Sequence, residues 1–180
     1  MKKIFLTAVI FQFFTVINFG QIKSTGIGLN IGLGQIKGNS PSLTSLSGSV
    51  QFDINTTFWE DLIIRLGYHY SKKVEYFLPE NSSGKYYPFV KFFSLQTLIK
   101  QEWGENFFLE EGIGVVYLND RTFSDTNDWS IGTIFSGLFG IDFRTGESGF
   151  TIGAGAEYAV AFRNRNASSV ALKIQSFYYF

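Results

Sequence analysis

The chain has 180 residues, of which 45% are hydrophobic and 17% charged, a balance that excludes a disordered tail. Its 15 basic residues match its 15 acidic ones, so it lacks the basic excess typical of a nucleic-acid binder. The absence of cysteine excludes a disulfide scaffold, a thiolate zinc site and a thiol nucleophile, and a single histidine excludes a multi-histidine metal site. The counts of 21 Phe, 9 Tyr and 19 Gly favour many β-strands.

Residues 1–20 read as a secretory signal peptide. Two lysines precede a mostly apolar stretch over 4–17, and Gly20 supplies the small residue before a cleavage that we predict ahead of Gln21. A membrane-anchoring helix is the less favoured alternative, because such a helix needs about 20 apolar residues. The domain that remains is then residues 21–180.

Apolar and polar residues alternate along most of this domain. Alternation of period two is a strand signal, because successive side chains of a strand point to opposite faces. The segments with this pattern are 26–34, 49–58, 62–71, 88–100, 106–118, 129–143, 151–160 and 170–180. The segment 88–100 is the least regular, since both of its faces carry apolar groups. The pattern predicts eight strands and no second domain.

The connections between these segments are expected to alternate in length. Longer ones are expected near 35–45, 72–87, 119–128 and 162–168, and shorter ones near 59–61, 101–106 and 144–148. Short periplasmic turns and longer outer loops are typical of outer-membrane barrels. The fold predicted is all-β: an eight-stranded antiparallel up-and-down transmembrane β-barrel.

The direction of the apolar faces separates two kinds of barrel. A secreted soluble barrel that binds an apolar ligand has its apolar side chains inside, and a membrane barrel has them outside. Eight strands enclose room for side chains or one small ligand only, which suits the faces made of glycine and a few charges. Aromatic residues near both strand ends also suit the two membrane interfaces. They are Tyr68, Tyr70, Tyr117, Trp129 and Tyr158 near the longer connections, and Trp59, Trp103, Tyr178 and Phe180 near the shorter ones.

The leader, the eight alternating segments and Phe180 with Tyr178 two residues before it resemble the small OmpX/OmpA-type outer-membrane barrels. The segment 106–114, NFFLEEGIG, resembles a strand motif of Bacteroidota barrel proteins. Ser176 departs from the resemblance, because members of the family often have an apolar residue at this position of the last strand. The resemblance implies a location in the outer membrane of a Gram-negative bacterium and recognition of the C-terminal strand by the barrel-assembly machinery. It also implies a monomer that contacts outer-membrane lipid and lipopolysaccharide. The role implied is structural, adhesive or interactive through outer loops, without catalysis or cofactor.

Seven titratable residues are predicted to share the narrow interior. They are Asp53, Arg65, His69, Glu110, Asp142, Glu157 and Lys173. Because unpaired buried charges are costly, we expect ion pairs that fill the barrel, with a path for protons or small cations as the alternative. Glu111 and Lys91 are predicted to face lipid, where a charge at the midplane costs up to ~2–4 kcal/mol.

A catalytic alternative rests on His69 and Ser71. Residues two apart on a strand share a face, so this histidine is a candidate to activate the serine, with Glu75 or Glu80 to orient it. The spacing resembles that of outer-membrane lipid A deacylases, which are also eight-stranded barrels. Lys72 stands where that family has Asn, and the pair is predicted to point inward. No catalytic, cofactor-binding or metal-binding residue is therefore assigned.

The predicted outer loops supply the candidate surface for partners. Residues 72–87 combine aromatic side chains with charges of both signs, which suits either a bound partner or packing on the rim of the barrel. Arg163 and Arg165 are candidates to contact anionic lipopolysaccharide.

Overall fold

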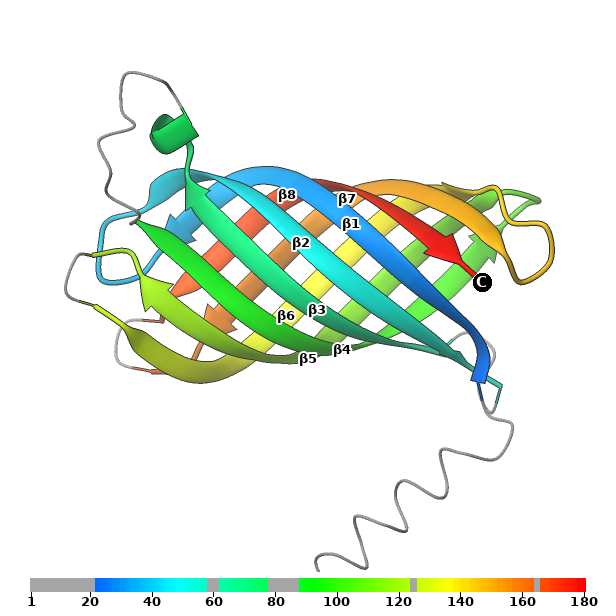
Figure 1. Ribbon diagram of the computed structural model, residues 1–180, viewed down its shortest axis with the longest axis horizontal. Helices are drawn as coiled ribbons and strands as arrows, with labels where there is room; N and C mark the ends of the chain where they lie inside the picture. The colour runs from blue at the N-terminus through cyan, green and yellow to red at the C-terminus, as the bar shows by residue number, and fades with distance from the viewer. Residues whose placement is uncertain (1–21, 58–61, 78–87, 124–125, 164–165) are drawn as a thin grey trace, which may run out of the picture.

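The computed structural model describes residues 22–57, 62–77, 88–123, 126–163 and 166–180. Its strands are β1 (Ile22–Lys37), β2 (Leu43–Thr56), β3 (Leu62–Lys73), β4 (Phe89–Trp103), β5 (Phe107–Arg121), β6 (Asp128–Asp142), β7 (Gly149–Ala161) and β8 (Ser168–Tyr179), with a short 3-10 helix η1 (Val74–Phe77) after β3. Each strand pairs antiparallel with the next, and β8 pairs with β1 to close the barrel (Figure 1). The predicted eight-stranded up-and-down barrel is confirmed. Within the described ranges, no helix combines the length and hydropathy needed to span a membrane.

The connections define two ends of the barrel. We call the end with residues 38–42, 74–88, 122–127 and 162–167 the loop end, and the end with 57–61, 104–106 and 143–148 the turn end. The expected contrast in length is weaker than predicted, since only 74–88 is clearly longer than the rest. The reason is that the ladders run on to the rim: Ile36 still pairs with Leu43, and Asp120 with Asp128.

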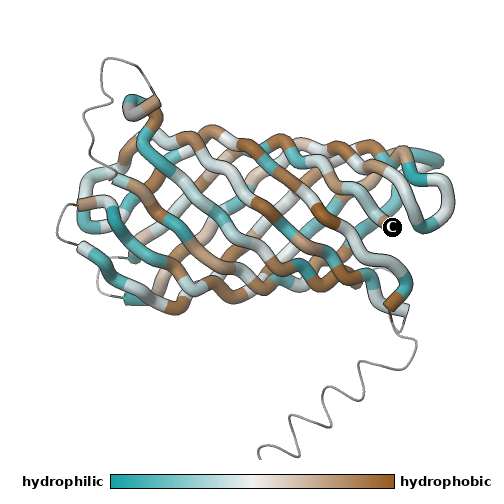
Figure 2. Tube along the Cα trace, viewed as in Figure 1, coloured by the Kyte–Doolittle hydropathy of each residue, from teal (hydrophilic) through white to brown (hydrophobic). Residues whose placement is uncertain are grey.

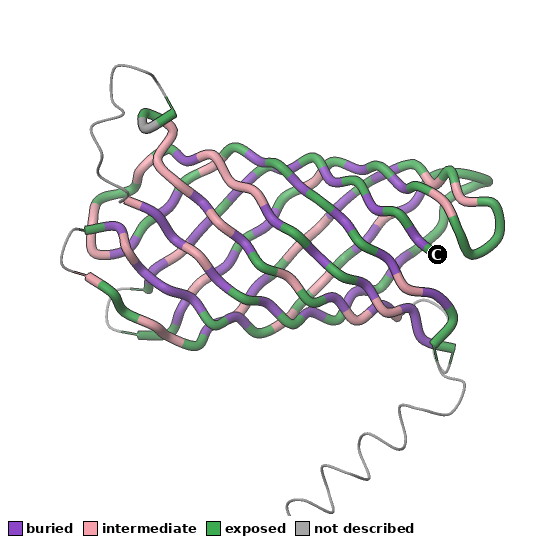
Figure 3. Tube along the Cα trace, viewed as in Figure 1, coloured by how far each residue is buried: buried purple, intermediate pink, exposed green. Residues whose placement is uncertain are grey.

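Burial alternates along every strand (Figure 3), and so does hydropathy (Figure 2). Ile174 is 67% exposed, whereas its neighbours Lys173 and Gln175 are each 4% exposed. Leu29 and Phe52 likewise point outward. The apolar faces therefore form the outer surface of the barrel. The alternative of a soluble barrel with an apolar interior site is wrong, because its faces would have to be reversed.

Inward-facing glycines make room for the large side chains of the neighbouring strand. A Cβ on Gly28 would overlap the ring of Phe177, and a Cβ on Gly26 would overlap that of Tyr179. On the other side of the barrel, Phe108 fills the space left by Gly140. The glycine-rich face of the sequence is thus a packing device, which lets bulky groups occupy a narrow barrel.

We expect Gly28→Ala to lower the free energy of unfolding by about 1–3 kcal/mol, because the added Cβ overpacks the interior. The ring of Phe177 cannot move away freely, since the guanidinium of Arg65 lies 4.4 Å from its centroid. Gly137→Ala is the matched control, because Gly137 faces outward and a Cβ there meets nothing within 4 Å. Urea unfolding in detergent micelles measures both. Equal effects of the two substitutions would contradict the packing argument.

The interior near the loop end is apolar. Its buried cluster consists of Ile36, Val90, Phe92, Val116, Leu118, Ile134, Ala159, Ala161 and Ala167. The sequence pattern did not foresee this cluster, since it assigned mainly glycine and polar groups to the inward faces. The lumen is therefore occupied by apolar side chains at this end and by polar side chains further in.

Candidate functional site

Arg65 lies at the centre of the polar part of the lumen. Its position in β3 is directly opposite Asp53 in β2, and both side chains are fully buried. Arg65 Nε is 2.7 Å from Asp53 Oδ1, and its Nη1 is 2.7 Å from Glu110 Oε1. The hydroxyl of Tyr179 donates to Asp53 Oδ2 at 2.8 Å. One guanidinium thus bridges two carboxylates across the barrel and closes the lumen at this level.

A second network is centred on His69. Its Nδ1 is 3.0 Å from Glu157 Oε1, and its Nε2 is 3.0 Å from Ser94 Oγ. Lys173 Nζ donates to the other oxygen of Glu157 at 2.9 Å. Gly67 makes this contact possible, because a side chain there would meet both His69 and Ser94. The prediction that these interior charges pair with one another is borne out by the geometry.

The predicted catalytic pair of His69 and Ser71 is not formed. Ser71 Oγ lies 3.4 Å from Ser169 Oγ, and Glu75 pairs with Lys73. Glu80 lies outside the described residues.

The structure instead places His69 between Glu157 and Ser94, in contact with both. Acid, base and hydroxyl follow one another in this way in the triads of hydrolases. All three are buried, and the ring of Phe92 stacks on His69 at 4.3 Å. Ser94 as a whole residue is only 5% exposed. In the described ranges, no group of three or more His, Cys, Asp or Glu side chains is arranged to hold a metal ion.

Two further cations balance the interior acids. Lys100 is buried and faces inward on β4, and Arg144 reaches Asp142 from the turn 143–148. Arg144 Nη2 donates to Asp142 Oδ2 at 2.6 Å. Burial alone would lower the pKa of Arg144, but the hydrogen bonds and the charge of Asp142 overcome it and raise that pKa. The sequence analysis missed Lys100, although this residue has the same parity on β4 as Gln96, which is also buried.

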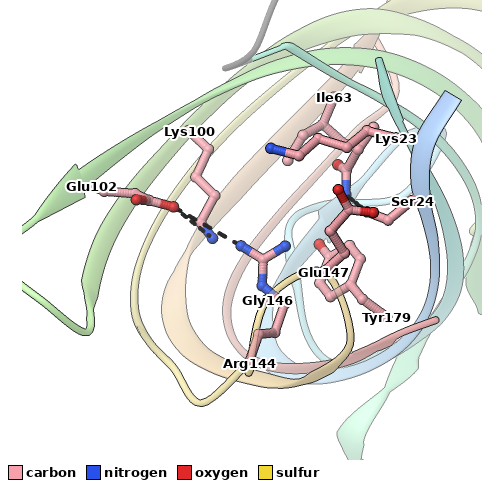
Figure 4. A pocket seen from close by; sticks show the side chains of 10 residues that line it. Lys23, Ser24, Ile63, Lys100, Glu102, Arg144, Gly146, Glu147 and Tyr179 are labelled. Carbon is pink, nitrogen blue, oxygen red and sulfur yellow. Dashed lines mark hydrogen bonds and ion pairs between the residues drawn. The ribbon is translucent and has the colours of Figure 1, made fainter. Parts of the chain in front are cut away.

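The turn end holds a polar cavity of about 300 Å³ (Figure 4). Side chains from β1, β2, β3, β4 and β8 line it together with the turn 143–148. The charged residues among them are Lys23, Lys100, Glu102, Arg144 and Glu147. Tyr179, whose hydroxyl donates to Asp53, is part of this lining and connects the cavity to the Arg65 network.

The connection 38–42 closes the loop end. The backbone N–H and the Nδ2 of Asn39 both donate to Asp120 Oδ2 at 3.0 Å, and the N–H of Ser40 donates to Thr122 Oγ1 at 3.2 Å. Asp120 belongs to β5, which lies four strands from β1 in either direction around the barrel. The connection thus crosses the mouth above the apolar cluster.

Two charged residues point outward, as the alternation predicts. Glu111 is exposed between Ile99 and Gly137. Lys91 Nζ lies 5.5 Å from the ring centroid of Trp129, a cation–π contact near the loop end. A lysine there can extend its charge toward the membrane surface.

Aromatic side chains gather near both ends of the outer face. Tyr117 stacks on Trp129 at 4.7 Å near the loop end, and Phe150 packs against Tyr178 at 4.7 Å near the turn end. Trp59 lies outside the described residues. The two groups have the arrangement of the aromatic girdles that flank the apolar band of membrane barrels.

No model of a known protein family and no curated protein matches the chain. Solved structures do match it, and the Neisserial surface protein A (NspA) has a TM-score of 0.68 at 11% identity, covering 87% of this chain and 97% of that one. The chain has the fold of a small eight-stranded outer-membrane β-barrel. The N-terminal barrel domain of Pseudomonas aeruginosa OprF has a TM-score of 0.55 at 12% identity, covering 86% of this chain and 97% of that one.

A third outer-membrane barrel with this fold is Ail, the attachment invasion locus protein of Yersinia pestis. Its TM-score is 0.55 at 10% identity, with 87% of this chain and 98% of that one covered. At such identities the similarity shows the fold and nothing of the chemistry. The relation of residues 106–114 to Bacteroidota barrels stays a prediction.

Proposed function

We propose that the protein is a non-catalytic barrel in the outer membrane of a Gram-negative bacterium, with a structural, adhesive or interaction role through its loop end. One observation carries this proposal: the apolar side chains face outward around a lumen that is filled and closed at the loop end. Such a barrel offers lipid its sides and offers polar partners only its ends. A steady pore is disfavoured, because the Arg65 network and the apolar cluster occupy the lumen.

The route to the membrane is part of the same proposal. Residues 1–20 act as the export signal, and the C-terminal strand β8 is the element that the barrel-assembly machinery recognises. Tyr178 and Phe180 are exposed on its outer side, which supports that role. Because β8 closes on β1 of the same chain, the barrel needs no second subunit and is proposed to be a monomer.

Lipopolysaccharide is the proposed lipid partner. Lys37, Lys72 and Lys91 have the outward parity at the loop end, and Arg163 is exposed in the connection 162–167, where their charges suit lipid phosphates. Arg165 and residues 78–87 lie outside the described ranges. The outer face of strands β1 to β4 has an apolar groove of about 390 Å³, which suits an acyl chain. Its lining includes Val50, Phe52, Leu66, Tyr68 and Phe93.

The orientation of the barrel in the membrane is tested by labelling introduced cysteines, since the chain itself has no cysteine. Ser42→Cys places a thiol at the loop end, and Glu105→Cys places one at the turn end; both positions are exposed. We expect a membrane-impermeant maleimide to label Ser42→Cys on intact cells, and Glu105→Cys only after the outer membrane is permeabilised. Labelling in the reverse order would overturn the proposed role of the loop end.

The non-catalytic role and the lipid contact have separate tests. Mass spectrometry of lipid A should give the same spectrum for cells with the wild-type protein, with Ser94→Ala and with the gene deleted. A modification present in the wild type alone would show an enzyme.

The lipid contact is tested by binding. Purified lipopolysaccharide should bind the double variant Lys72→Gln, Lys91→Gln more weakly than it binds the wild type, whereas it should bind Glu105→Gln as tightly as the wild type. A pull-down with residues 72–87 searches for a protein partner.

A further inference from the structure

The cavity at the turn end holds two opposite charges that the interior ion pairs do not use. Those pairs join Lys100 and Arg144 to Asp142 and Glu102. Lys23 and Glu147 line the same cavity and take no part in them. These two side chains therefore offer one positive and one negative charge to a guest.

The positive side of the cavity is reinforced by Arg144. This residue uses its Nε and Nη2 for Asp142, and its guanidinium faces the cavity (Figure 4). Figure 4 shows Lys23 and Lys100 extending toward the same space, and Glu147 lines the cavity as well. A carboxylate that enters here meets Lys23 and the N–H groups of Arg144 that Asp142 leaves over, and hydrogen bonds of this kind are strengthened by charge.

The negative side of the cavity has a second acceptor. Asn55 Nδ2 donates to Ser24 Oγ at 2.6 Å, while Asn55 Oδ1 is buried without a partner among the described residues. A buried acceptor without a donor is costly, and Asn55 is part of the lining of this cavity. Glu147, an exposed carboxylate in the same lining, suits an ammonium group.

We propose that this cavity binds a small zwitterion of amino-acid or dipeptide size, with its carboxylate on Lys23 and Arg144 and its ammonium on Glu147. The volume of about 300 Å³ is that of a small-molecule site. A simple anion leaves Glu147 unpaired and a simple cation leaves Lys23 unpaired, whereas a zwitterion pairs both. The inference goes beyond the role of the loop end, since it concerns the opposite end of the barrel.

The test uses the purified protein in detergent micelles and isothermal titration calorimetry with three probes. Alanyl-alanine carries both charges, N-acetyl-alanyl-alanine lacks the ammonium, and alanyl-alanine amide lacks the carboxylate. We expect alanyl-alanine to bind about tenfold more tightly than either analogue, which corresponds to about 1.4 kcal/mol. Lys23→Gln and Glu147→Gln should each weaken its binding about tenfold.

Glu105→Gln is the matched control, because Glu105 is an exposed carboxylate at the same end of the barrel but outside the lining of this cavity. It should leave the affinity for alanyl-alanine unchanged, and heat-modifiable gel mobility should show that all three variants are folded. Equal binding of the N-acetylated probe would show a plain anion site and overturn the proposal. No binding of alanyl-alanine at about 10 mM would overturn it as well.

Discussion

Arg65→Met is expected to lower the free energy of unfolding by about 3–5 kcal/mol, because it removes one partner from a buried ion network. Arg65 donates to both Asp53 and Glu110, and its side chain is fully buried. Without it, two carboxylates remain buried in the interior without their cation, and Tyr179 still donates to Asp53. The unfolding midpoint in urea, measured in detergent micelles by far-UV circular dichroism, gives the change.

Two companion variants separate the charge from the packing. The triple variant Arg65→Met, Asp53→Asn, Glu110→Gln removes all three charges and should recover most of the lost stability, because no unpaired charge is left. Arg65→Lys keeps the charge but loses the planar guanidinium that reaches both carboxylates. It should therefore lower the free energy of unfolding less than Arg65→Met does. Arg163→Met, at an exposed position, is the control and should change little. A triple variant no more stable than Arg65→Met would show that the charges are not the cause.

For most strands the alternation in the sequence predicts which face points outward and which points into the lumen. Period-two alternation assigns every strand residue to one of two faces, so Asp53, Arg65 and Glu157 are predicted inward and are buried. Alternation does not say which inward residues meet. Arg65 and Glu110 are 45 residues apart, and their contact depends on the stagger of a closed barrel.

The predicted pair of His69 and Ser71 is not formed because the side chain of His69 turns to other partners. Ser94 is directly opposite Gly67 and so is a diagonal neighbour of His69, which reaches it over the space that the glycine leaves. On its other side the ring contacts Glu157 of β7. The apolar cluster at the loop end was missed because its members lie on separate strands, and alternation along one strand does not show that Phe92 and Leu118 are directly opposite each other on β4 and β5.

Ile174→Arg is expected to lower the free energy of unfolding in lipid bilayers by about 2–4 kcal/mol, because it places a charge near the middle of the apolar band. Ile174 is 67% exposed and lies midway along β8, between Leu172 and Ser176 on the same face. In a water-soluble protein, an arginine at so exposed a position would cost little. The size of the loss therefore reports whether hydrocarbon or water surrounds this face.

Val170→Arg is the matched control, because it lies on the same face of β8 but close to the loop end. Here the arginine can extend to the membrane surface, so the expected cost is about 0–1 kcal/mol. Both variants are unfolded by urea in bilayers of the same phospholipid, and intrinsic tryptophan fluorescence follows the transition. The difference between the two positions is the decisive quantity, since it cancels the general effect of adding an arginine to the strand. If the two losses were equal, the outer face of β8 would not lie in hydrocarbon, and the membrane-spanning assignment of the barrel would fail.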